Sequence, residues 1–266
     1  MKEVEGKVVL EQNGQLNLKP ILEDSKFKFK CYPGISCFNA CCHEIDVILT
    51  PFDVLRMKNQ LGIKSDEFLA NYTHLQKLKG TDIPLVKLKM HDTDDKKNHC
   101  VFLCEKGCTV YESRPAVCRN YPTGLATQDP NSGESSNPFF IIEEKMCKGH
   151  FEVEEWTVDS WKKNQGVTEL DELSKPWMEL VARLKNRSLK DANDQKMNFF
   201  LMACFDLDTF SNFVFNSSFL QKFNVDEETT QKIKADEESL LKFGFEWLKF
   251  VLFNEGSFSD LKSGKT

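Results

Sequence analysis

The sequence lacks the long apolar run that a membrane span requires. No run approaches about 18 residues, and the best stretch, 243–253, contains Glu246 and Lys249. The N-terminus has no basic stretch followed by an apolar one and no cleavage site, so we expect no secretory signal, a cytoplasmic location and no membrane partner. Basic residues are also in deficit, since 35 Lys and Arg against 41 Asp and Glu give a net charge of −6. This balance argues against a dedicated nucleic-acid partner.

Motifs of common enzyme classes are missing as well. The 13 glycines are scattered, and no GxGxxG loop follows a strand pattern. Neither a Ser/His/Asp arrangement nor an HExxH motif is evident. The sequence therefore identifies no catalytic residue and no nucleotide-binding residue.

Composition changes near residue 150. Residues 1–150 carry 20 basic and 20 acidic residues, whereas residues 151–266 carry 15 basic and 21 acidic ones together with 14 of the 22 phenylalanines. We therefore predict a cysteine-rich, metal-organised domain over 1–151 and an acidic, aromatic-rich helical bundle over 152–266. The predicted fold is mainly α with a small β component.

Capping and turn signals predict individual elements. Thr50 and Pro51 begin a helix that Gly62 ends, and Ser65 caps a second helix through Tyr72. Asn13-Gly14 suits the turn of a hairpin. In the second half we expect a helix after Thr168, which Pro176 bends or divides. We also expect helical structure over 196–215 and one long helix over 226–253. Helical packing is the expected role of the second-half aromatics.

Cysteine is the unusual component. Nine of the ten cysteines lie between residues 31 and 147, in two clusters followed by Cys147. The clusters are Cys31-x5-Cys37-x3-Cys41-Cys42 and Cys100-x3-Cys104-x3-Cys108-x9-Cys118.

Burial, disulfides and metal binding compete to explain these cysteines. Burial suits Cys204, which lies on a predicted helix, but not four cysteines within twelve turn-rich residues. Disulfides are disfavoured because the chain shows no secretory signal and a bridge between Cys41 and Cys42 would be strained. Clustered thiolates instead fit zinc, an iron–sulfur cluster or copper(I).

The adjacent pair Cys41-Cys42 constrains any metal site. In a strand the two side chains point to opposite faces, and in a helix they are about 100° apart. We therefore expect the two thiols to serve different centres, or only one of them to be a direct ligand. Eight thiolates would make two sets of four.

Ordered motifs over residues 27–150 resemble the YkgJ-type cysteine cluster family, described as zinc- or iron-chelating. Besides the cysteines, the resemblance includes Ile48–Asp53, Gly107–Tyr111, Arg114-Pro115, the residues from Cys118 to Pro122, and Cys147-Lys148-Gly149. It implies the metal ligands Cys31, Cys37, Cys41, Cys42, Cys100, Cys108, Cys118 and Cys147. Two departures stand out: the first gap has five residues where the usual form has two, and the extra Cys104 is a possible alternate ligand.

The expected function is binding of a metal ion, either zinc or iron, with an iron–sulfur cluster among the options. Distant relatives of flagellin lysine-N-methylase in this family suggest one alternative, an enzyme of protein lysine methyl transfer or redox chemistry. Another alternative is a structural module whose fold is stabilised by zinc. In this case the helical half would offer an acidic aromatic groove to a protein partner.

Several polar residues allow two interpretations. The histidines are His43, His74, His91, His99 and His150, and we expect each to be exposed or to support a ligand rather than to bind metal. Beside Cys118, Arg114 and Arg119 either form local pairs or helix caps, or compensate thiolate charge. Asp206 and Asp208 are expected to be surface carboxylates.

Overall fold

The structure, a computed structural model, describes residues 17–78, 83–91, 98–125, 139–186, 194–223, 225–256 and 258. Packing divides the chain into two units of two stretches each: unit 1 is Met1–Cys41 with Val117–Thr168, and unit 2 is Cys42–Ala116 with Glu169–Thr266. This division differs from the predicted boundary at residue 151, because residues of 42–116 share a hydrophobic core with the C-terminal helices. The predicted Asn13-Gly14 hairpin lies outside the described residues.

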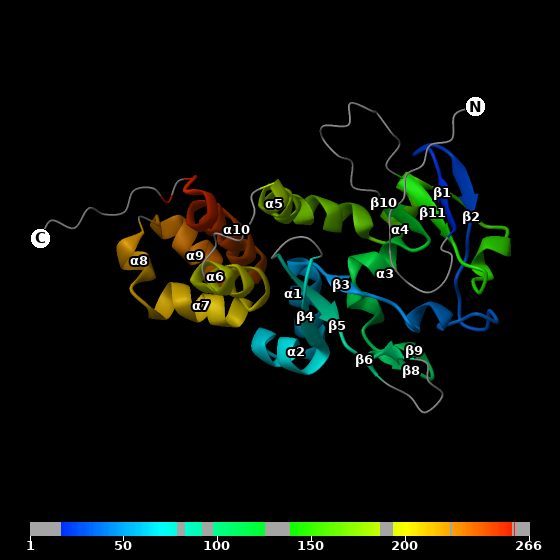
Figure 1. Cartoon of the computed structure of the whole chain (residues 1–266), viewed down its shortest axis with the longest axis horizontal. Coiled ribbons are helices and arrows are strands. Elements are labelled where there is room, and N and C mark those ends of the chain that lie inside the picture. The colour runs from blue at the N-terminus through cyan, green and yellow to red at the C-terminus, as the bar shows by residue number, and fades with distance from the viewer. Residues whose placement is uncertain are drawn as a thin grey trace, which may run out of the picture. The chain divides into compact units, whose positions relative to one another are not determined.

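Unit 2 contains most of the helices in the described parts of the chain (Figure 1). They are α1 (Pro51–Leu61), α2 (Ser65–Tyr72), nearly all of α5 (Val167–Asn186), α6 (Asp194–Phe205), α7 (Leu207–Asn216), α8 (Phe219–Lys222), α9 (Glu227–Ala235) and α10 (Glu237–Phe253). Together with short strands, they make the fold mainly α with a small β component, as predicted.

Aromatic side chains fill the core of unit 2. Trp247 of α10 is 2% exposed and lies against Phe199, Phe210 and Phe219, with ring centroids 5.1 to 5.6 Å apart. Helix α10 packs on α6 at Gly244, where an added Cβ would lie 3.0 Å from the carbonyl oxygen of Ala203. The predicted packing role of the second-half aromatics is confirmed.

Helix α1 begins and ends as its sequence predicts. Thr50 is the N-cap, and its hydroxyl accepts a hydrogen bond from the backbone N–H of Asp53, while the Asp53 carboxylate accepts one from the Thr50 N–H. Pro51 is the first helical residue, and Gly62 closes the helix in the left-handed conformation, with φ 67°.

Other helix boundaries differ from the prediction. The expected long helix over 226–253 is broken at Asp236, which leaves the helical conformation and accepts a hydrogen bond from the Ser239 N–H as the N-cap of α10. Asp206 divides the 196–215 segment in the same way, as the N-cap of α7. Pro176 lies inside a helix that continues from Val167 to Asn186. The N-cap of α2 is Lys64, not Ser65.

Short antiparallel strands complete unit 2. The sheet β3-β5-β4 is formed by Ile48–Leu49, Pro84–Leu88 and Thr73–Lys77. Two small ladders follow along the chain, β6 (Met90–His91) with β7 (His99–Cys100), and β8 (Leu103–Cys104) with β9 (Gly107–Cys108). These ladders carry Cys100, Cys104 and Cys108 of the second cysteine cluster.

Unit 1 is built from two small sheets and short helices. Strands β1 (Asn17–Pro20), β11 (Phe139–Glu143) and β10 (Thr123–Leu125) form one sheet, and β12 (Glu155–Thr157) pairs with β2 (Lys26–Lys28). Helix α4 (Val158–Asn164) contributes Trp161, whose ring lies 5.4 Å from that of the buried Phe29. Most of helix α3 (Ala116–Asn120) also belongs to this unit.

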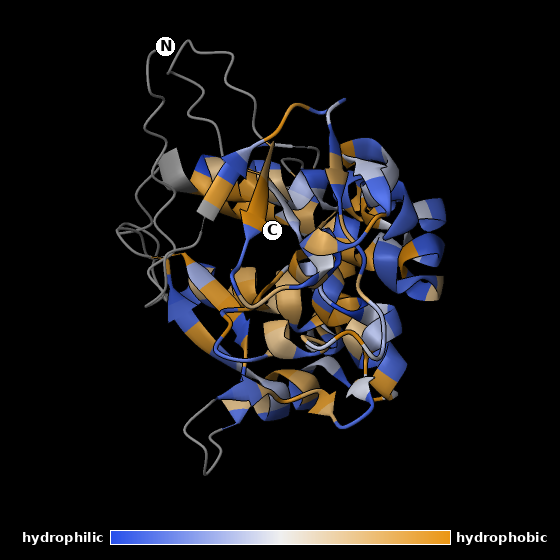
Figure 2. Cartoon of the chain, turned by 90° about the vertical axis from the view of Figure 1, so that its right-hand side faces the viewer, coloured by the Kyte–Doolittle hydropathy of each residue, from blue (hydrophilic) through white to orange (hydrophobic). Residues whose placement is uncertain are grey.

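The helices that the structure describes carry hydrophilic residues beside hydrophobic ones, as Figure 2 shows. None of these helices is both long enough and apolar enough to cross a membrane.

Candidate metal centres

The predicted ligands fall into two sets, one in each unit. Unit 1 holds Cys31, Cys37, Cys41, Cys118 and Cys147, and unit 2 holds Cys42, Cys100, Cys104 and Cys108. The division runs between the adjacent residues Cys41 and Cys42, which both belong to the short 3-10 helix Ala40–Cys42. The two adjacent residues are therefore assigned to different units.

Cys204 is the cysteine outside both sets. It is 1% exposed in α6, and burial raises the pKa of its thiol well above the ordinary value. The prediction that Cys204 is a core residue is confirmed.

In unit 1, backbone hydrogen bonds bring the first cluster to the turn that follows Cys147. The N–H of Lys30, next to Cys31, donates to the carbonyl of Gly149 at 3.1 Å. The N–H of Lys148 donates to the Cys37 sulfur, also at 3.1 Å. Hydrogen bonds to sulfur are typical of thiolate metal sites, where they reduce the charge on the ligand.

Gly149 is required for this approach. An added Cβ would lie 2.8 Å from the carbonyl oxygen of Lys30 and 2.8 Å from the ring of Phe29, closer than Cβ contacts occur. Glycine at this position therefore allows the segment leading to Cys31 to reach the Cys147 turn.

Tyr121 connects the Cys118 segment to the same turn. Its hydroxyl donates to the Glu144 carboxylate at 3.0 Å. Burial raises the pKa of Tyr121, and hydrogen bonding and charge interaction with Cys147, together with the nearby Glu144, raise it further. The tyrosine follows Cys118 by three residues, so this contact draws a fourth cysteine of unit 1 toward the turn. The motifs around Cys118 pointed to Tyr121, but no sequence signal predicted its contact with Cys147.

The two arginines near Cys118 make local structural contacts. The buried Arg119 donates from Nη1 to the carbonyl of Gln165, the C-cap of α4, at 3.0 Å. Arg114 donates to the Tyr111 carbonyl at 2.9 Å, and its guanidinium lies 4.0 Å from the centre of the Tyr111 ring. The sequence left two interpretations of these arginines open, local pairing or helix capping on one side and charge compensation on the other. The hydrogen bond from Arg119 to the C-cap residue of α4 supports helix capping.

In unit 2, an isolated bridge brings the residue after Cys42 beside the residue before Cys100. His43 forms this antiparallel bridge with His99. His99 in turn pairs with His91. The ring centroids are 6.0 Å apart for His43 and His99, and 5.6 Å for His91 and His99.

Cross-strand partners share one face of a ladder, and neighbours along a strand point to opposite faces. The three histidines therefore lie on one face, and Cys100 lies on the other.

Cys104 and Cys108 occupy different faces of the next hairpin. Cys108 pairs with Leu103, and Cys104 pairs with Gly107. Cys100 and Cys108 both pack in part against the core of unit 2, whereas Cys104 is exposed. This placement groups Cys108 with Cys100 and sets the extra Cys104 apart.

Two imidazole nitrogens near the cysteines are buried without a hydrogen-bond partner, Nδ1 of His43 and Nε2 of His150. A buried polar atom left without a partner costs about 1–3 kcal/mol, so such atoms are rare in folded proteins. Imidazole nitrogen is a ligand of zinc and of some iron sites. The chemistry of the donors in both units, soft thiols with an adjacent unpartnered imidazole, therefore fits zinc or iron.

A complete ligand shell is not formed in the structure. Among the residues that it describes, no three Cys, His, Asp or Glu side chains are close enough together to hold an ion. What the fold provides is convergence of separate chain segments in each unit, and the ligand set itself stays a prediction.

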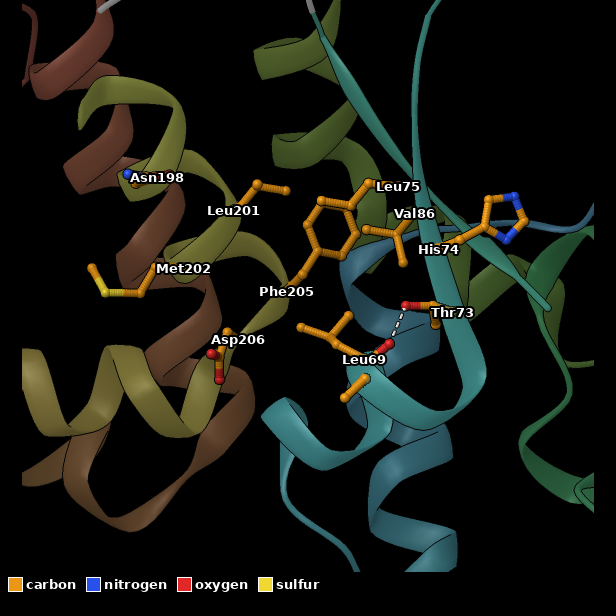
Figure 3. Close-up of a pocket in the computed structure, with 11 residues that line it drawn as sticks. Leu69, Thr73, His74, Leu75, Val86, Asn198, Leu201, Met202, Phe205 and Asp206 are labelled. Atoms are coloured by element: carbon orange, nitrogen blue, oxygen red, sulfur yellow. Dashed lines mark hydrogen bonds between the residues drawn. The ribbon is translucent and has the colours of Figure 1, made fainter. Parts of the chain in front are cut away.

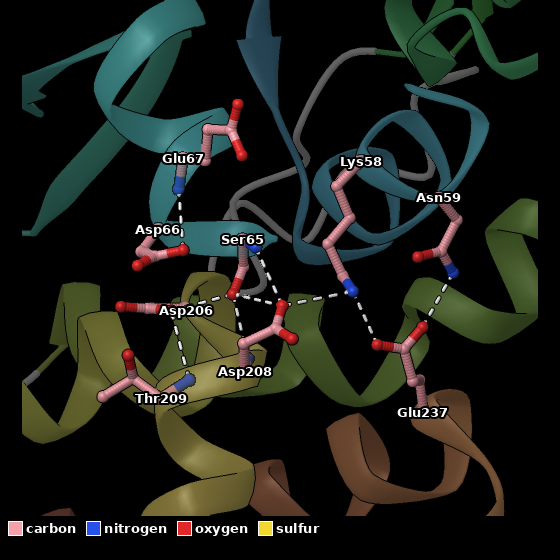
Figure 4. A network of polar contacts seen from close by, with 9 residues as sticks. All are labelled: Lys58, Asn59, Ser65, Asp66, Glu67, Asp206, Asp208, Thr209 and Glu237. Carbon is pink, nitrogen blue, oxygen red and sulfur yellow. Dashed lines mark hydrogen bonds and ion pairs between the residues drawn. The ribbon is translucent and has the colours of Figure 1, made fainter. Parts of the chain in front are cut away.

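Asp206 and Asp208 are not simple surface carboxylates (Figure 4). Asp208 accepts hydrogen bonds from the backbone N–H and hydroxyl of the buried Ser65, at 2.8 and 2.9 Å, and lies 3.3 Å from the Lys58 ammonium. Asp206 accepts from the same hydroxyl at 2.8 Å. Burial acts to raise the pKa of Asp208, but the contacts with Ser65 and Lys58 outweigh it and hold the pKa below the ordinary value. The two carboxylates join α7 to the start of α2.

Unit 2 also contains a pocket of about 410 Å³, bounded by α2, β4, β5 and α6 (Figure 3). Its walls are mostly apolar, with side chains such as Leu69, Val86, Leu201 and Phe205. The acidic residue in its lining is Asp206, whose carboxylate is already engaged by Ser65. No cysteine is among its lining residues, so the pocket is separate from the candidate metal centres. The predicted acidic partner groove stays a prediction.

Comparison with known proteins finds one family model over the cysteine-rich segment. No curated protein and no solved structure matches the chain. Residues 30–148 match the model of one family, CxxCxxCC, whose description is "putative zinc- or iron-chelating domain". The matched range includes every predicted ligand from Cys31 to Cys147. Residues 30–148 thus match the CxxCxxCC family model, in agreement with the cysteine cluster family that the motifs resemble.

Proposed function

We propose that this protein binds zinc or iron through two thiolate centres, one in each unit. The observation that carries the proposal is the division of the clustered cysteines, which leaves at least four thiols in each unit and separates Cys41 from Cys42. Four thiolates complete a tetrahedral zinc site or hold one iron–sulfur cluster. The family match supports metal chelation as the function of this segment.

Each centre would draw its ligands from chain segments distant in sequence. In unit 1 the donors are Cys37 and Cys147 with others from Cys31, Cys41 and Cys118. In unit 2 they are Cys42, Cys100 and Cys108, with the exposed Cys104 as the remaining thiol of the set. A zinc ion in a closed thiolate site would stabilise the fold, and an iron–sulfur cluster would add electron transfer. No contact among the described residues supports redox chemistry or lysine methyl transfer. These two alternatives rest on the family resemblance alone.

The test is metal analysis of anaerobically purified protein. We expect about two zinc ions per chain in a colourless protein, or iron with inorganic sulfide in a brown one. The double variants Cys37→Ser/Cys147→Ser and Cys100→Ser/Cys108→Ser should each lose one centre and keep the other. The control is Cys204→Ala, because that thiol is buried in α6 and should leave the metal content unchanged.

Absence of bound metal in the full-length protein would contradict the proposal. Loss of all metal from either double variant, with both variants still folded by circular dichroism, would contradict the division into two centres.

A further inference from the structure

The turn that carries Cys147 also carries His150, a residue just beyond the range that matches the family. Backbone hydrogen bonds from Cys147 to Glu144 and from Phe151 to Lys148 wind this segment into successive tight turns, and residues 149–151 form a 3-10 helix. His150 lies in this 3-10 helix, and Cys147 precedes the helix, three residues before His150.

The His150 ring has one nitrogen that the protein leaves unpaired. Its Nε2 is buried and has no hydrogen-bond partner. The backbone of Ile142 also interacts with the ring. Imidazole nitrogens bind zinc and iron in proteins.

Aromatic packing fixes the ring further. The Phe29 ring lies edge-on at 5.2 Å, and Tyr121, which interacts with Cys147, lies at 6.5 Å. A histidine that served only as packing would leave Nε2 buried without a partner, whereas a bound ion would provide one.

We propose that His150 binds metal through Nε2 in the unit 1 centre, beside Cys147 and Cys37. This inference rests on the proposed function. The resulting site would be a mixed thiolate and imidazole site, and it would carry less negative charge than four thiolates around the same ion. His43 has a similar buried nitrogen, but its ladder places it on the face opposite Cys100, so we do not extend the proposal to it.

The experiment isolates the unit 1 centre in the Cys100→Ser/Cys108→Ser background and loads it with Zn²⁺ or Co²⁺ alone. X-ray absorption of the zinc form should show imidazole scattering together with sulfur. Into this background we introduce His150→Asn, which keeps a polar side chain but removes Nε2. Chelator competition should then show zinc affinity lowered by more than about 100-fold, since loss of supporting residues alone costs 10–100-fold. The Co²⁺ absorption should change as well.

The matched control is His74→Asn, on the exposed side of β4, which should leave both spectra and affinity unchanged. If the background protein binds metal and His150→Asn keeps the same affinity and spectra, the role of His150 is refuted while the proposed function stands. All-sulfur scattering from the bound metal would refute it equally. If the full-length protein binds no metal in the first place, the proposed function fails instead.

Discussion

Asp208 allows the sharpest stability prediction, because its contacts join three helices of unit 2. Its carboxylate accepts two hydrogen bonds from the buried Ser65 and lies 3.3 Å from the Lys58 ammonium. At an effective dielectric constant of about 20, the Coulomb energy at that distance is about 5 kcal/mol. The side chain is 31% exposed, so solvent screening reduces this value, and Lys58 keeps its contact with Glu237 at 2.6 Å.

We therefore expect Asp208→Ala to lower the free energy of unfolding by about 2–3 kcal/mol at pH 7, mainly through the lost hydrogen bonds to a charged acceptor. Urea denaturation followed by circular dichroism measures this change. The control is Glu246→Ala, which removes an exposed ion pair with Lys249 and should cost less than about 0.5 kcal/mol.

The same network predicts a pH dependence. The pKa of Asp208 is lowered in the folded state, so its stabilising contribution is complete above the unfolded-state pKa of about 4. The contribution is lost as pH falls through the lower folded-state pKa. The difference between wild type and Asp208→Ala should therefore shrink below about pH 4. A loss under about 0.5 kcal/mol at pH 7, or a difference unchanged at pH 3, would refute the reasoning.

Three further substitutions test contacts that position the cysteines or their supporting helices. Gly149→Ala should unfold or distort unit 1, because its Cβ would lie 2.8 Å from the Lys30 carbonyl; near-ultraviolet circular dichroism should change, and a native spectrum would contradict this. Asp53→Ala should lower the free energy of unfolding in urea by about 2–4 kcal/mol. The substitution removes part of the capping box of α1, and it also removes the carboxylate that accepts a hydrogen bond from the Ala116 N–H at 2.8 Å. An unchanged free energy of unfolding would show that the cap does not stabilise the fold. Arg119→Ala should lower the thermal midpoint and reduce the free energy of unfolding by about 1–3 kcal/mol, because it removes the hydrogen bond to the C-cap of α4. Loss of metal without loss of stability would instead indicate that Arg119 compensates thiolate charge.

Helix boundaries show where local sequence is sufficient. Thr50, Pro51 and Gly62 fix α1 because capping and φ preferences act within a few residues. The break at Asp236 has a local signal too, since an aspartate can cap the helix that follows it. The apolar stripe begins only at Leu240, however, and the prediction joined α9 and α10 because it extended that helix back to residue 226.

The sequence by itself determined the chemistry of this protein: clustered thiols, their spacing, the mainly helical fold and the family of residues 30–148. Only the tertiary structure decided which thiols share a unit, because packing joins residues 42–116 to helices more than 50 positions later in the chain. It also gave Asp208 and Arg119 their partners and left Nε2 of His150 buried without one. Such pairings depend on contacts between segments far apart in sequence, which no local pattern of residues encodes.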